Sequence, residues 1–349
     1  MSKNKLTALL KQKIDAQGPL TLAAFLEEVL YHPQWGYYAQ HNPIGGHGDY
    51  ITAPEMTQVF GELLALWAYV QWQNKGCPHP FALIELGPGN GTLMQDALRI
   101  IQRYPDFAAA AHVYLLEKNQ HLRNQQQQKL STYNDKITWV EDFEDILPMP
   151  SIIIANEFFD ALPFQQFIYK QGRWWERHIN YEANDFVYQD CPTTFQVPAE
   201  NAHEGAQEGA IYEYCALGQH FAQKIAERLS QAPGATLIID YGYEEPAFGD
   251  TLQALRNHRY HPPLVDIGTA DLTHHVNFTQ LQQTFRHYSL QVQPLTTMGD
   301  FLSDLGIVQR TELLCQLATP TQRASLLTAT ARLIDPNHMG SLFKVLVSS

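Results

Sequence analysis

Three glycines at alternate positions form the most distinctive turn in this sequence. Residues 83–93 read as a short apolar run that ends in Glu85, followed by the string Gly87-Pro88-Gly89-Asn90-Gly91. These glycines leave no side chains on the inside of the turn, so a ligand can lie against the backbone. The amphipathic segment 92–103 follows, and its first N–H groups would face the same ligand. The alternative is a plain strand-to-helix turn, because short glycine strings also occur by chance.

Polar residues close several apolar runs of the chain. These runs, at 82–86, 112–116, 136–140, 151–155 and 236–239, alternate with helical stretches, as in a parallel sheet that carries helices on both faces. Ligands of such sheets bind at the carboxyl ends of the strands. Each polar residue alone could simply end a strand, but several in register with the glycine turn favour one binding crevice. The closing residues are Glu85, Glu117, Asp142, Asn156-Glu157 and Asp240.

The elements that would position these residues fall into three parts of the chain. Residues 1–78 predict a helical region with a glycine-rich loop, and residues 79–163 and 210–349 predict an α/β core. Residues 164–209 read as an antiparallel β insertion, which we expect to face the substrate. The expected helices are 6–15, 20–30, 57–73, 212–231, 278–288, 299–309, 311–317 and 321–334. The further expected elements are insertion strands at 167–169, 174–179 and 186–188, an irregular segment at 241–277, an edge strand at 290–298 and a last strand at 342–347.

The glycine-rich loop at 44–55 is a candidate lid. It reaches the ligand only if the N-terminal helices fold over the crevice, and Thr52 and Glu55 are then its expected contacts. A purely structural turn is the alternative.

Composition excludes several classes of protein. The 349 residues carry a net charge of −13, which argues against a general nucleic-acid binder and suits a basic partner such as an arginine-rich protein segment. The four cysteines are far apart and the fifteen histidines are scattered, so we expect neither a disulfide framework nor a metal site. Neither a secretory signal nor a membrane-spanning segment is visible, so we expect a soluble protein of the cytoplasm without membrane insertion.

The spacing of the glycines separates two classes of nucleotide-binding turn. Dinucleotide-binding dehydrogenases use Gly-x-Gly-x-x-Gly, with an acid about twenty residues later for the ribose. Here the third glycine comes one residue early, and Glu85 precedes the first glycine by two residues. This shape resembles motif I of class I S-adenosylmethionine-dependent methyltransferases, in which the turn cradles the methionine half of the cofactor. The resemblance implies a Rossmann-like fold with a mostly parallel, seven-stranded sheet.

The same resemblance assigns roles to further residues. Glu117 matches the acid that binds the ribose hydroxyls, Asp142 matches the side chain that reads the adenine amine, and Asn156-Glu157 matches the start of the substrate-facing loop. Together with the two lid residues, the expected cofactor-binding set is Glu85, Gly87, Gly89, Gly91, Glu117, Asp142, Asn156, Thr52 and Glu55.

Longer strings make the match closer. The strings at 48–55, 60–62, 85–91, 156–163, 268–278 and 339–346 all resemble signatures of the MidA family, in order, from about Pro19 to Val347. This family contains the mitochondrial complex I assembly methyltransferase and bacterial relatives. The resemblance implies methylation of an arginine in a protein. His274 and Asn277 depart from the family pattern, and neither touches the cofactor motif.

An arginine substrate directs attention to two carboxylates and a histidine. Guanidinium is protonated at neutral pH, so the site must orient it and take a proton. Glu157 and Asp160, three positions apart, are the expected pair, and His275 would relay the proton. Alternatively, Asp160 caps the turn at 161–163 and His275 is satisfied within a packed loop.

Other functions remain open at this stage. One is an assembly factor that keeps the cofactor pocket without turnover, and another is a small-molecule methyltransferase. The sequence leaves the methylated protein, the number of methyl groups and the pairing of the chain with itself undetermined, although a homodimer is possible.

Overall fold

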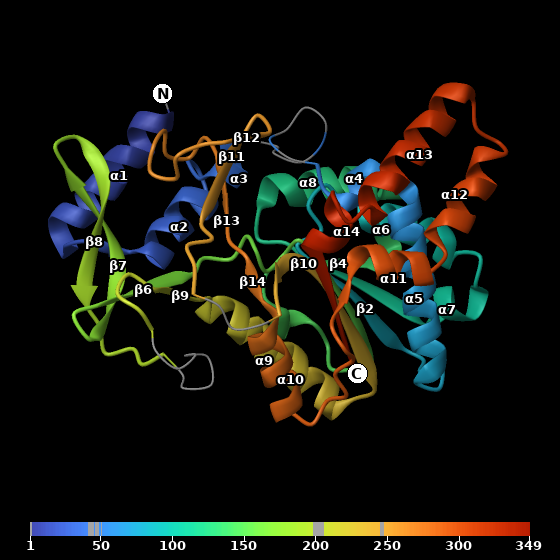
Figure 1. Ribbon diagram of the computed structural model, residues 1–349. Helices are drawn as coiled ribbons and strands as arrows, with labels where there is room; N and C mark the ends of the chain where they lie inside the picture. The colour runs from blue at the N-terminus through green and yellow to red at the C-terminus, as the bar shows by residue number, and fades with distance from the viewer. Residues whose placement is uncertain (1, 41–44, 46–48, 50, 198–205, 245–247) are drawn as a thin grey trace. The chain divides into compact units, whose positions relative to one another are not determined.

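The structure is a computed structural model that describes residues 2–40, 45, 49, 51–197, 206–244 and 248–349. The chain divides into two compact units (Figure 1). The first unit comprises Met1–Tyr50, Phe159–Phe221 and Tyr243–Thr279, and the second comprises Ile51–Phe158, Ala222–Gly242 and Gln280–Ser349. These bounds differ from the three expected parts, because the expected N-terminal region 1–78 is divided between the two units.

A mixed sheet runs through the second unit. Seven of its strands follow the order β15-β16-β10-β5-β2-β3-β4. Neighbours from β10 to β4 are parallel, whereas β16 is antiparallel to both β10 and β15. This order confirms the predicted mostly parallel sheet, and an eighth short strand, β14 Val276–Asn277, also pairs with β10. The bounds are β2 Phe81–Leu86, β3 Ala111–Leu116, β4 Ile137–Val140, β5 Ser151–Asn156, β10 Gly234–Tyr243, β15 Thr296–Thr297 and β16 Phe343–Ser348.

Helices cover both faces of this sheet, as Figure 1 shows for α5 on one side and α10 on the other. Apolar side chains of α5 and α6 pack against the sheet face that carries Leu83, Val113 and Leu237. Helix α5 begins after Thr57, whose hydroxyl accepts the N–H of Val59. The helices and 3₁₀ turns are α4 Ala53–Met56, α5 Gln58–Asn74, α6 Thr92–Ile101, α7 Pro105–Ala110, α8 Gln120–Lys129, η1 Ser131–Lys136, η2 Phe143–Asp145, α11 Met298–Asp304, α12 Ile307–Cys315, α13 Pro320–Ile334 and α14 Met339–Leu342; α9 Ala216–Gln231 and α10 Phe278–His287 begin in the first unit.

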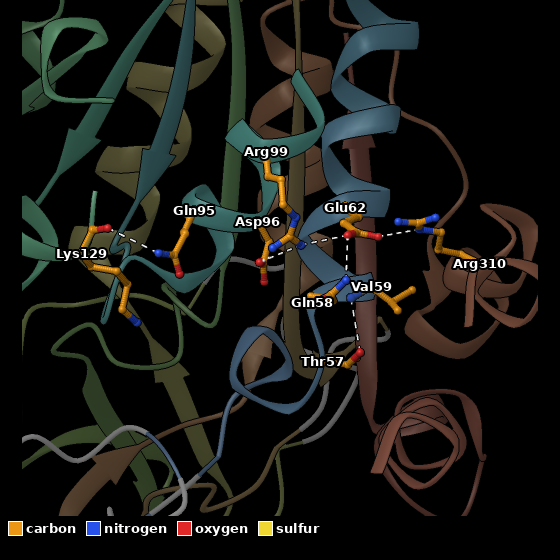
Figure 2. Close-up of polar contacts among 9 residues, drawn as sticks. All are labelled: Thr57, Gln58, Val59, Glu62, Gln95, Asp96, Arg99, Lys129 and Arg310. Carbon is orange, nitrogen blue, oxygen red and sulfur yellow. Dashed lines mark hydrogen bonds and ion pairs between the residues drawn. The ribbon is translucent and has the colours of Figure 1, made fainter. Parts of the chain in front are cut away.

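A buried carboxylate joins three helices of the second unit (Figure 2). Glu62 of α5 is 1% exposed, and it accepts hydrogen bonds from Arg99 of α6 at 2.8 Å and from Arg310 of α12 at 2.6 Å. The preceding residue, Gly61, has no room for a side chain, because an added Cβ would lie 2.8 Å from the Cβ of Asp96 on α6. The two helices therefore cross closely, and the ion pair between Glu62 and Arg99 fixes the crossing.

The first unit contains an antiparallel sheet in the order β1-β7-β6-β9, with β8 beside β7. Its core packs α2 on this sheet through Phe25, Ile179 and Phe186. A second sheet has the order β12-β11-β13. The bounds are α1 Ser2–Gln17, β1 Leu20–Thr21, α2 Leu22–Tyr31, α3 Tyr37–Gln40, β6 Gln165–Lys170, β7 Arg173–Glu182, β8 Asp185–Pro192, β9 Ile211–Tyr214, β11 Gln253–Arg256, β12 Arg259–Tyr260, β13 Asp271–Thr273 and β14 Val276–Asn277.

The β segment at 164–209 is part of a larger sheet than the sequence suggested. The three expected strands are present as β6, β7 and β8, but they share their sheet with β1 and β9 from outside this segment. The helix expected from 212 was wrong at its start, because Ile211–Tyr214 is strand β9 and the helix begins at Ala216. The strand forms because its backbone pairs with β6, a partner more than forty residues earlier in the chain.

Two further expectations were wrong. The segment 241–277 is not irregular, because it completes β10 and contributes β11 to β14. Consequently Asp240 does not end its strand; it lies buried inside β10, opposite Lys344. The edge strand expected at 290–298 shrinks to Thr296–Thr297 and an isolated bridge at Val292, since Pro294 lacks the N–H that a continuous ladder needs.

Glu62→Gln should destabilise the protein. The substitution leaves Arg310 without its buried anion and Arg99 with Asp96 alone, and we expect a loss of about 2 kcal/mol, because both arginines remain partly hydrated. Thermal unfolding followed by circular dichroism should show a melting temperature lower by roughly 3–6 °C. Glu312→Gln, an exposed position on α12, is the matched control and should leave the melting temperature unchanged. Equal losses in the two variants would contradict the role assigned to Glu62.

Candidate cofactor and catalytic site

The glycine turn has the backbone that its sequence predicts. Gly87, Gly89 and Gly91 have φ angles of +64°, +52° and +74°, in the left-handed region that side chains disfavour. An added Cβ at Gly87 would lie 2.8 Å from the ring of Phe158, so this position lacks space as well. Gly91 donates its N–H to the carbonyl of Pro88 at 2.7 Å and leads directly into α6. The turn therefore presents bare backbone at the carboxyl end of β2.

Two buried polar atoms at this end of the sheet lack a partner among the described residues. They are Oε2 of Glu85, on β2, and Oδ1 of Asn156, which ends the neighbouring strand β5. Burial raises the pKa of Glu85 to about 8, and its side chain is 3% exposed. Unsatisfied buried acceptors are costly in a folded protein, so a ligand that donates hydrogen bonds would stabilise both.

Glu117 follows β3 and is also buried. Its carboxylate accepts the N–H of Asn119 at 2.8 Å and a hydrogen bond from Gln126 at 3.1 Å. Burial raises its pKa to about 7. Asp142, by contrast, is exposed two residues after β4, and its Oδ1 lies 3.3 Å from Nζ of Lys118. A ligand that spans these strand ends would meet one buried and one solvated acid.

The described part of the lid loop contacts the glycine turn. Of the expected loop 44–55, residues 44, 46–48 and 50 lie outside the described residues, so the observation concerns 51–55. The carboxylate of Glu55, on α4, accepts hydrogen bonds from Asn90 of the turn, at 3.3 Å, and from Thr92 at the start of α6. Thr52 is buried immediately before α4. The structure thus brings Glu55 to the glycine turn, whereas for Thr52 it shows burial beside α4.

Glu157 holds an uncommon backbone conformation. Its φ is +50°, and its N–H donates to the carbonyl of Ile239 at 2.9 Å. Its Oε1 accepts hydrogen bonds from the N–H of Ala53 and from Nδ2 of Asn156, both at 3.2 Å. A non-glycine residue in this conformation costs energy and is frequent at functional sites. The carboxylate is therefore oriented by donors on both sides, in the same unit as the glycine turn.

Asp160 and His275, the other expected catalytic residues, lie in the first unit. The carbonyl of Asp160 accepts the N–H of His274 at 3.1 Å, which joins the 156–163 and 268–278 strings. The backbone N–H of His275 donates to Thr251 at 2.9 Å, and its ring lies 2.8 Å from the amide of Gln253. Burial lowers the pKa of His275, so the ring is neutral at neutral pH and can accept a proton.

A further buried acid lies near Asp160. Asp271 begins β13 and accepts the hydroxyl of Tyr38 at 2.9 Å. Burial and then the charge of Asp160 raise the pKa of Asp271 to about 7. Sequence reasoning missed its role, although Asp271 lies in the 268–278 string. It also missed Gln126, which nothing distinguishes within the glutamine run of α8.

Comparison with known proteins identifies the ligand. A family model described as "Putative S-adenosyl-L-methionine-dependent methyltransferase" matches residues 63–296, more than half of the chain. The chain belongs to this family. A crystal structure from Burkholderia thailandensis with bound S-adenosyl-homocysteine has a TM-score of 0.86 and 24% identity, and the alignment covers 100% of this chain and 92% of that one. This likeness confirms the Rossmann-like class I methyltransferase fold.

Curated relatives point in the same direction. The mouse mitochondrial protein arginine methyltransferase NDUFAF7 is 32% identical over 97% of this chain and 84% of its own length. The human protein of the same name is 30% identical over 98% of this chain and 83% of its own length. The predicted family and cofactor, S-adenosyl-L-methionine, are confirmed. The bare turn at Gly87 and the unpaired oxygens of Glu85 and Asn156 fit this cofactor, whose methionine half carries an ammonium donor.

Gly87→Ala should weaken cofactor binding more than tenfold. The new methyl group requires a strained φ and displaces the ring of Phe158, which borders the turn. Calorimetry with S-adenosyl-homocysteine measures the effect. Gly76→Ala is the matched control: it has a φ of +81° but open space around its Cβ, so it carries the strain without the clash. A normal affinity in Gly87→Ala would contradict the assignment of the turn.

Glu85 should make the ligand-free protein less stable as pH rises. Its pKa is about 8 when folded and near 4.5 when unfolded, so between these values the folded state holds a proton that the unfolded chain has lost. The contribution of Glu85 to the free energy of unfolding is fully present below pH 4.5 and is lost as pH rises to about 8. The difference in melting temperature between the unchanged protein and Glu85→Gln should decrease across this pH range. Above about pH 8 it should stay constant. A constant difference would show that Glu85 is ionised throughout.

Proposed function

We propose that this chain transfers the methyl group of S-adenosylmethionine to an arginine side chain of a protein substrate. Relatives named protein arginine methyltransferases, 30–32% identical over 97–98% of the chain, support the arginine substrate. The observation that carries the proposal is Glu157, a carboxylate on strained backbone oriented by two donors beside the cofactor turn. A protein substrate with basic character also suits the net charge of −13.

Glu157 would bind the guanidinium. The donors from Ala53 and Asn156 both bond Oε1 and hold this oxygen of the carboxylate in place. A carboxylate held in this way forms a charge-assisted fork with the planar guanidinium and polarises the attacking nitrogen. The bound cofactor supplies a methyl group on a sulfonium with a good leaving group, so the protein contributes mainly position.

Asp160 would be the second carboxylate, and His275 would accept the released proton. Asp160 is 5% exposed and lies near Asp271, whose pKa is raised first by burial and then by the charge of Asp160. Such a pair attracts a cation more strongly than one acid alone. His275 is neutral at neutral pH because of its burial, as a proton acceptor must be.

Other parts of the proposal extend the sequence analysis. We propose that the predicted cofactor residues, including Glu117 and Asp142, bind the ribose and the adenine, and that the strands between 164 and 209 face the substrate. None of the described helices combines the length and the apolar character needed to cross a bilayer. The curated relatives are named as mitochondrial, so a cytoplasmic location stays a prediction, as does a homodimer.

Glu157→Gln should abolish transfer to protein. The purified chain is incubated with cell lysate and S-adenosylmethionine that carries a radiolabelled methyl group. A labelled protein band should appear, and hydrolysis of the band should give methylarginine. Glu157→Gln should reduce the label at least a hundredfold, in line with the loss of a group that acts in the transition state. Asp106→Asn, an exposed acid at the start of α7, is the control and should label normally.

The same experiment separates the alternatives. Label in solvent extracts instead of protein would indicate a small-molecule methyltransferase. Binding of S-adenosyl-homocysteine without any transfer would indicate an assembly factor that keeps the pocket. Methyllysine in the labelled band would contradict the arginine substrate and leave the cofactor assignment intact.

A further inference from the structure

Gln126 is a fully buried polar side chain on a polar helix. Leu122 and Gln126 are the buried residues of α8, one turn apart, so Gln126 occupies a position where an apolar residue would normally pack. Its exposed fraction is 0%. Burial of an amide is unfavourable unless its hydrogen-bonding groups find partners. The partners of Gln126 therefore explain why the helix carries an amide there.

Three hydrogen bonds satisfy this amide and fix its orientation. Its Nε2 donates to the carbonyl of Gly89 at 2.8 Å and to Oε2 of Glu117 at 3.1 Å. Its Oε1 accepts the indole N–H of Trp139, on β4, at 3.0 Å. An indole can only donate, whereas a carbonyl and a carboxylate can only accept, so the amide cannot be reversed without losing all three bonds.

The stem of the side chain also packs on the glycine turn. An added Cβ at Gly91 would lie 3.4 Å from Cγ of Gln126, which is contact distance. Gln126 thus meets the turn at two glycines and meets Glu117 at the end of the next strand. These two places flank the cofactor site, the turn on the methionine side and Glu117 on the expected ribose side.

We propose that Gln126 is a positioning residue that couples the methionine cradle to the ribose-binding acid. Its amide holds the carbonyl of Gly89 and the carboxylate of Glu117 at one fixed separation, so that both halves of S-adenosylmethionine meet prearranged groups. This inference rests on the proposed ribose-binding role of Glu117. It is independent of the arginine substrate, because cofactor binding alone tests it.

The groups around Glu117 indicate how the loss of Gln126 would change the ionisation of its carboxyl group. The carboxylate faces the N–H groups of Lys118 and Asn119, the amide of Gln126 and the charge of Arg123, and all four favour its ionised form. Removal of the amide therefore raises the pKa of Glu117 further. A protonated carboxyl accepts hydrogen bonds from ribose hydroxyls less well than a carboxylate does.

Gln126→Met tests the proposal. Methionine keeps the volume but leaves the carbonyl of Gly89 and Oε2 of Glu117 without this donor. We expect the dissociation constant for S-adenosyl-homocysteine, measured by calorimetry at pH 7.5 and 25 °C, to rise roughly tenfold to hundredfold, as for loss of a hydrogen bond to a charged group. Gln125→Met, the same change at the adjacent, half-buried position, is the control and should bind normally.

The pH profile distinguishes positioning from a merely structural role. In the unchanged protein the affinity should increase as pH rises through about 7, where Glu117 ionises. In Gln126→Met this increase should move to higher pH. Glu85 is present in both proteins, so its own titration cancels in the comparison.

A second variant keeps the proposal testable if Gln126→Met does not fold. Trp139→Phe removes the donor to Oε1 and leaves both contacts of Nε2 possible, so it should weaken binding less than Gln126→Met and more than Gln125→Met. A lower melting temperature with unchanged affinity and pH profile, in whichever variant folds, would overturn the proposal. That result would leave arginine methylation untouched.

Discussion

The close crossing of α5 and α6 is the constraint on which the cofactor site depends. Gly61 permits the approach, and Glu62 fixes it through Arg99 of α6. Helix α6 begins at the glycine turn, and α4 directly precedes α5, so the same crossing places Glu55 against the turn. A shift of α5 relative to α6 would therefore separate the lid residue Glu55 from the glycine turn.

Buried acids recur in both units and have a common physical meaning. In the second unit Glu85 and Glu117 have raised pKa values, and in the first Asp271 and Glu213 do, with burial as the leading cause in each case. Burial of a carboxyl group opposes folding unless donors compensate. Glu213 is compensated by its own chain, through Thr251 and Gln166, whereas Oε2 of Glu85 lacks such a donor among the described residues. That contrast supports the proposed role of Glu85 in cofactor binding.

Local pattern was sufficient for much of the fold and for the cofactor motif. The apolar runs at 82–86 and 151–155 became β2 and β5 within one residue, because central parallel strands are apolar throughout. The start of the helix expected at 212 was wrong, since pairing with β6 overrides local pattern at Ile211–Tyr214. Gln126 could not be distinguished, because its burial arises only when β3 and the turn come together.

The sequence by itself determined the turn, its cofactor and the family, because glycine spacing and neighbouring acids are properties of contiguous residues. Tertiary structure decided which side chains surround that turn. Glu55 and Gln126 come from segments about thirty-five residues before and after the turn, and helix packing alone brings them to it. Tertiary structure also decided the protonation of Glu85 and Asp271, because a pKa shift reflects the burial and charge of neighbours that lie close only in the folded chain.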